Sequence, residues 1–264
     1  MEVLGVIIVL GLIGYAIYIN TSNYRYDIAN DLLEARDFQK AKGIFLEIYD
    51  NHKEAPISYA KCQLGLMKAA PSNARVSFLM DIAARAKSLP IGVDQSAYSH
   101  INDEAHIFFF EKKYDSIKAS GSLVVLKTFL QEIENFKNKS LNTRFNRIKS
   151  GLMQRIGVLV FNQALQLEGK MNFEEANAKY SEAASLFKAL SNKANFENAV
   201  LRGNIVSLKL GSYTESNQLD FENGDSEIKD DYYFRLAHKY CFEKQFTRAQ
   251  EILENYLNDA HPGV

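Results

Sequence analysis

Residues 173–180 read FEEANAKY, and closely similar stretches occur at 38–45 (FQKAKGIF) and at 246–253 (FTRAQEIL). Each stretch begins with an aromatic residue, has alanine at its fourth position and ends on a large apolar residue. A short pattern that recurs in three parts of one chain indicates an internally repeated structural unit. The sequence is therefore best interpreted as an array of similar elements.

The residues around each stretch follow the period of an α-helix. Before the first stretch, Ala29 and Leu33 share one helical stripe, and Phe38, Ala41 and Phe45 share a second stripe after a polar break at 35–37. Asp37, within that break, is a suitable N-cap for the second helix. The same order of helix, short break and helix is expected around 164–183 and around 237–253. The repeated unit is therefore predicted to be a helical hairpin.

These hairpins resemble tetratricopeptide (TPR) repeats, in which small residues let paired helices pack closely and large residues fill the space beside them. The resemblance rests on three sets of residues: Ala29, Phe38, Ala41 and Phe45; Ala164, Phe173, Ala176, Tyr180 and Ala183; and Ala237, Phe246, Ala249 and Leu253. It implies that these residues pack between helices and that the hairpins stack into a right-handed α-solenoid. One hairpin cannot bury its own apolar face, so stacking is required for stability.

Composition agrees with an all-α fold. The chain of 264 residues contains 14 glycines and 4 prolines, which argues against a protein of strands and turns. We expect three parts: an anchor at 1–20 and two sets of TPR-like hairpins at 22–137 and 138–264.

The first twenty residues differ from the rest, because Val3 to Ile19 contain no charged residue. That length is sufficient for a helix that crosses a bilayer. The start lacks the basic residues of a cleaved signal peptide, so we expect a retained membrane anchor at residues 3–19. Basic residues follow the anchor and none precedes it, which favours a body in the cytoplasm. We expect a single-pass protein of a bacterial inner membrane; a periplasmic body is the alternative.

Charge and motifs exclude several functions. A net charge of −1 argues against a general electrostatic grip on nucleic acid. No GxSxG, HExxH or glycine-rich phosphate loop is present, so we expect neither an enzyme nor a cofactor. One alternative is a metal-dependent enzyme. His100 and Glu104 are four residues apart and Asp103 and His106 are three apart, so each pair could lie on one face of a helix and contribute metal ligands. The two cysteines, Cys62 and Cys241, lie within apolar helical patterns and are expected to be buried.

The resemblance implies a groove that binds a peptide or helix of another protein. We therefore expect a membrane-anchored scaffold or adaptor that organises a membrane-associated complex. The alternative is an extracytoplasmic chaperone or envelope-assembly factor. Four polar residues on expected first helices are candidates for the groove: Asn30, Gln166, Asn204 and Lys239. Charge is distributed unevenly along the chain. Residues 215–259 contain eleven acidic and five basic residues, whereas residues 111–155 contain ten basic and four acidic residues. We interpret both segments as solvated helix faces; the alternative is that each binds a partner of opposite charge.

Overall fold

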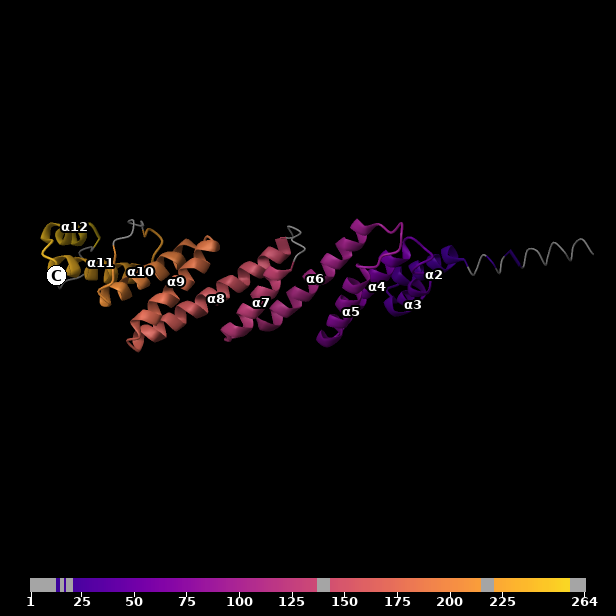
Figure 1. Ribbon diagram of the computed structural model, residues 1–264, viewed down its shortest axis with the longest axis horizontal. Helices are drawn as coiled ribbons and strands as arrows, with labels where there is room; N and C mark the ends of the chain where they lie inside the picture. Colours follow the sequence, from indigo (N-terminus) through magenta and orange to yellow (C-terminus); the bar gives the residue numbers. More distant parts are fainter. Residues whose placement is uncertain (1–12, 15–16, 18–20, 137–142, 215–220, 257–264) are drawn as a thin grey trace, which may run out of the picture. The chain divides into compact units, whose positions relative to one another are not determined.

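The computed structural model describes residues 13–14, 17, 21–136, 143–214 and 221–256 (Figure 1). Within these ranges every regular element is an α-helix, which confirms the all-α prediction. The helices are α2 (Ser22–Glu34), α3 (Phe38–Glu47), α4 (Ala55–Ala69), α5 (Ser72–Arg85), α6 (Gln95–Ile117), α7 (Leu123–Asn135), α8 (Thr143–Gly169), α9 (Phe173–Ala189), α10 (Lys193–Lys209), α11 (Ser226–Phe242) and α12 (Phe246–Tyr256).

The predicted membrane anchor at 3–19 lies almost entirely outside the described residues. Among the residues that are described, no helix combines the length and the apolar character that a membrane span requires.

The chain divides into two compact units. The first contains α2 to α5 and α6 as far as Asp115, together with residues 143–145 at the start of α8. The second contains α7, the remainder of α8 and α9 to α12. The boundary predicted between residues 137 and 138 falls outside the described ranges and stays a prediction.

One turn geometry recurs after five of the helices. In each turn a single residue has left-handed backbone angles, with φ between 54° and 67°. The amide of the next residue donates to a carbonyl five positions earlier, at 2.8 to 3.0 Å. This is the Schellman arrangement, which satisfies carbonyl groups at the end of a helix. The left-handed residues are Arg36, Met171, Ser191, Gly211 and Lys244.

Small residues lie where successive helices meet. In the second unit, Ala164 of α8 and Ala176 of α9 share one buried cluster with Tyr180 and with Val206 of α10. In the first unit, Ala29 and Ala41 share a cluster with residues of α4. Each cluster therefore joins a helical hairpin to the helix that follows it.

Two glycines allow an aromatic ring to approach a helix backbone. A Cβ atom on Gly65 of α4 would lie 2.7 Å from the ring of Phe38, and one on Gly157 of α8 would lie 2.7 Å from the ring of Phe187. Real Cβ atoms do not approach a ring so closely. Glycine at these two positions therefore sets how closely the neighbouring helices pack.

Candidate functional site

The residues expected to pack between helices fall into three groups by exposure. The buried ones are Ala29, Ala41, Phe45, Ala164, Ala176, Tyr180, Ala183, Ala237 and Ala249. Phe38, Phe173 and Leu253 are half-buried. Phe246 departs from the expectation, because its side chain is 65% exposed.

The exposure of Phe246 follows from its place in the chain. The equivalent Phe38 is covered by Gly65 of the next hairpin. The ring of Phe173 is likewise covered by Lys209 of the helix after its own hairpin, with Nζ 5.4 Å from the ring centroid. Among the described residues no helix follows α12, so nothing there covers Phe246.

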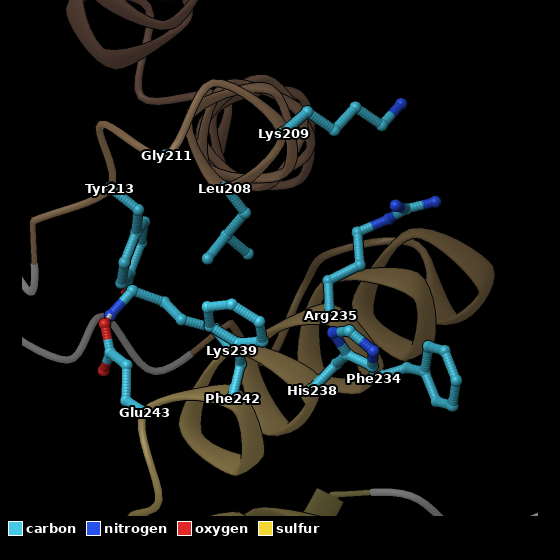
Figure 2. A pocket seen from close by; sticks show the side chains of 10 residues that line it. All are labelled: Leu208, Lys209, Gly211, Tyr213, Phe234, Arg235, His238, Lys239, Phe242 and Glu243. Atoms are coloured by element: carbon cyan, nitrogen blue, oxygen red, sulfur yellow. Dashed lines mark hydrogen bonds and ion pairs between the residues drawn. The ribbon is translucent and has the colours of Figure 1, made fainter.

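An open cleft of about 560 Å³ lies within the second unit, between the end of α10 and the second half of α11 (Figure 2). Leu208 and Lys209 of α10 form one wall, and Gly211 and Tyr213 of the turn that follows close one side. The opposite wall comes from Phe234, Arg235, His238, Lys239 and Phe242 of α11 and from Glu243.

The α11 wall carries two exposed phenylalanines. Phe234, His238 and Phe242 recur at every fourth position, so they form one stripe along the helix. The side chain of Phe242 is 86% exposed and that of Phe234 is 50% exposed. In Figure 2, Phe242 of α11 and Leu208 of α10 point towards each other across the cleft. Exposed rings that line a concave surface are typical of a binding site.

A hydrogen bond between two tyrosines holds one side of the cleft in place. The hydroxyl groups of Tyr213 and Tyr232 lie 2.8 Å apart, which fixes the Tyr213 ring beside the cleft. Burial and this hydrogen bond raise the pKa of Tyr232 above its ordinary value. The side of the cleft that Tyr213 closes is therefore anchored to the buried Tyr232 of α11.

Each cation of the rim pairs with a carboxylate. Nζ of Lys239 lies 2.6 Å from Glu243, and Nε of Arg235 lies 2.6 Å from Asp231. Nζ of Lys209 lies 2.7 Å from Glu168 of α8. The charges of the rim are thus balanced locally, and the apolar rings are its main binding feature.

Of the four residues suggested for a groove, the cleft contains Lys239. Asn204 is half-buried on α10, and Gln166 is exposed on α8; neither lines the cleft. Asn30 belongs to the first unit, where its amide donates to Glu34. Phe234 and Phe242 were not predicted as site residues from the sequence. The available signal was their four-residue spacing with His238, which places the three side chains on a different face of the helix from the buried Ala237.

The helix that carries the suggested metal pairs has other contacts. Nδ1 of His106 lies 2.8 Å from the carbonyl oxygen of Asn102, and burial lowers the pKa of this histidine. Glu104 pairs with Arg144 at 3.1 Å, and His100 is exposed. Within the described residues no three His, Cys, Asp or Glu side chains are grouped to hold a metal ion.

The two cysteines differ from each other. Cys62 is buried as expected, and burial raises the pKa of its thiol to about 12. Cys241 is exposed, which corrects the expectation for that residue: it lies on a side of α11 that no other helix in the described ranges buries.

Comparison with known proteins adds no further constraint: no family model, no curated protein and no solved structure matches this chain.

Proposed function

We propose that this chain is a membrane-anchored, TPR-like scaffold that holds a segment of another protein. In this proposal its hairpins stack into a right-handed α-solenoid, and residues 3–19 tether it to a bilayer with the body in the cytoplasm. The repeated turns and the small residues between successive helices support the stacked arrangement. The anchor adds to binding because it raises the local concentration of the cleft near membrane-resident partners.

One observation carries the binding function: Phe234 and Phe242 are exposed on the wall of a cleft, although aromatic rings are normally buried. The cleft is open, mostly apolar and has a paired polar rim, which suits a protein segment that presents an apolar side chain. Nothing in its lining forms a nucleophile with an adjacent base, so we propose binding without catalysis.

Affinity capture with a matched pair of variants tests this function. The tagged full-length protein, solubilised from membranes, should retain a specific protein. The Phe242→Ser variant should recover much less of that protein, because an aromatic side chain that acts as an interface hot spot contributes at least about 2 kcal/mol of binding free energy. Phe246→Ser removes a ring outside the cleft that is also mostly exposed, at 65%, and should retain the same protein. Failure of the parent to retain any specific protein, or equal recovery with Phe242→Ser, would contradict the proposal.

A reporter fused to the C-terminus tests the topology separately. We expect activity from a reporter that works only in the cytoplasm. Activity only from a reporter of the opposite compartment would place the body outside the cytoplasm and favour the chaperone or envelope-assembly alternative.

A further inference from the structure

The segment that leads into α11 is seated on the first half of α10. Phe221 is buried in the same cluster as Leu201 of α10. At Gly224 the backbone comes so close that an added Cβ would lie 2.9 Å from Cδ1 of Leu201. The connection is therefore packed directly against α10 just before α11 begins.

A buried carboxyl group forms two hydrogen bonds with this segment. Glu197 of α10 is only 7% exposed. Its Oε2 accepts from the backbone N–H of Asn223 at 2.6 Å, and its Oε1 accepts from Nδ2 of Asn223 at 2.9 Å. No ion pair joins Glu197 to a cation in the described part of the chain. A buried carboxyl group without a cation depends on such hydrogen bonds, so the Asn223 contacts are its main stabilisation.

The next residue of α10, Asn198, forms a hydrogen bond with Asp225, the N-cap residue of α11. Oδ1 of Asn198 accepts from the backbone N–H of Asp225 at 2.7 Å. The side chain of Asp225 in turn caps α11, accepting from the amides of Glu227 and Ile228. Asp225 thus links α10 to the start of α11. We refer to Glu197, Asn198, Asn223 and Asp225 as the clasp.

The clasp and the cleft lie at opposite ends of the same pair of helices. Residues 197–198 of α10 meet the start of α11, whereas Leu208 and Lys209 face residues 234–243. The two helices therefore run in the same general direction. From Asp225 to Phe242 the helix extends about 25 Å, so a rotation of about 10° at the clasp would move Phe242 by about 4 Å. That displacement is comparable to the width of a side chain.

We infer that Glu197 and Asn198 are positioning residues for the cleft: by fixing the start of α11 on α10, they set the separation of the two cleft walls. The inference deepens the proposed function and rests on it, because it predicts that binding depends on residues that do not line the cleft. The clasp supplies the preorganisation that an exposed, two-helix site otherwise lacks.

Two variants weaken the clasp in different ways. Asn223→Ala removes one hydrogen-bond donor and leaves the backbone N–H bond intact. Glu197→Gln keeps the size of the side chain but offers an amide with one acceptor oxygen to two donors. The matched control is Asn177→Ala, because Nδ2 of Asn177 donates to Ser207 Oγ at 3.2 Å and joins α9 to α10 without touching α11.

Hydrogen exchange of the full-length protein, read by peptide mass spectrometry, is the primary measurement. We expect amides of 226–242 to exchange about tenfold faster in both clasp variants, because loss of a buried hydrogen bond favours local opening. Amides of 173–189 should keep the parent rate, and Asn177→Ala should leave 226–242 at the parent rate. Parent-like exchange of 226–242 in both clasp variants, or equal acceleration in 173–189, would overturn the inference.

Recovery of the captured partner is the second measurement. It should fall about tenfold in the clasp variants and stay unchanged in Asn177→Ala. Full recovery despite faster exchange of 226–242 would also overturn the positioning role. If the parent captures no protein, the proposed function fails, and the exchange rates alone decide whether the clasp positions α11.

Discussion

Individual turn residues adopt a backbone conformation that their side chains disfavour. Met171, with φ of 60°, is largely exposed, and nothing in its environment requires a side chain. A left-handed residue with a Cβ costs about 1–2 kcal/mol, whereas glycine adopts this conformation freely.

Met171→Gly should therefore raise the free energy of unfolding by about 0.5–1 kcal/mol, after the extra entropy of glycine in the unfolded chain is subtracted. Urea titration followed by circular dichroism measures the change. Ala178→Gly, at an exposed position within α9, should lower the free energy of unfolding by about 1 kcal/mol. Changes of the same sign in the two variants would contradict the assigned turn geometry.

Small side chains between helices are a second feature at this scale. Ala176 is fully buried among Ala164, Tyr180 and Val206, so three helices meet at its methyl group. Ala176→Leu should lower the free energy of unfolding by about 1–3 kcal/mol, because the added atoms have no space. Ala178→Leu makes the same change on the exposed side of α9 and should stay within about 0.5 kcal/mol of the parent. Equal melting of the two variants would show that close helix packing at Ala176 is not required.

At the scale of elements, Glu168 joins three helices. This residue of α8 accepts from Tyr180 Oη of α9 at 2.8 Å and from Lys209 Nζ of α10 at 2.7 Å. Burial alone would raise the pKa of Glu168, but the hydrogen bonds from Lys209 and Tyr180 outweigh it and leave the pKa below its ordinary value. A carboxylate with a lowered pKa stabilises the folded state above its unfolded pKa. The stabilisation is lost as pH falls through the folded pKa.

Glu168→Gln should therefore lower the free energy of unfolding by about 1–3 kcal/mol at pH 7. The difference from the parent should shrink as pH falls below the ordinary range of a glutamate carboxyl group. Urea titrations at several pH values measure it, with the exposed Glu251→Gln as the control that should show no such trend. A difference that stays constant, or grows, towards low pH would contradict the role of the ionised carboxylate.

The helices and the positions of the breaks between them were predictable, but the left-handed geometry of the turns was not. Helical period and the break before Phe38, Phe173 and Phe246 correctly predicted helices that begin at these residues. The left-handed turn residues are Arg, Met, Ser, Gly and Lys, so they share no side-chain property. The turn is held by backbone hydrogen bonds, and sequence patterns carry little information about such bonds.

The cleft shows a similar limit. Lys239 was suggested from its place on a first helix, whereas Phe234 and Phe242 were not suggested. Aromatic residues at helical spacing look the same in a sequence whether they are buried or exposed. Their exposure depends on whether another helix covers them, as the contrast between Phe38 and Phe246 shows. That distinction is a property of tertiary packing.

At the scale of the whole molecule, each compact unit repeats one construction principle. Alanine or glycine brings neighbouring helices together. From α2 to α5 in the first unit, and from α8 to α12 in the second, successive helices pack against each other. In the proposed solenoid, contacts between neighbouring repeats supply the stability, and the long surfaces of the stack are available to bind another protein. We propose that the anchor at 3–19 brings this surface to the membrane and that the cleft between α10 and α11 selects the partner.

Photo-crosslinking tests that central proposal most directly. A photoreactive phenylalanine analogue at position 242 of the full-length chain, in the source cells, should form a covalent adduct with one discrete membrane-associated protein after illumination. The same analogue at position 246, where the native ring is also mostly exposed but lies outside the cleft, should form no such adduct. No adduct from position 242, or the same adducts from both positions, would contradict the assignment of the cleft as a protein-binding site.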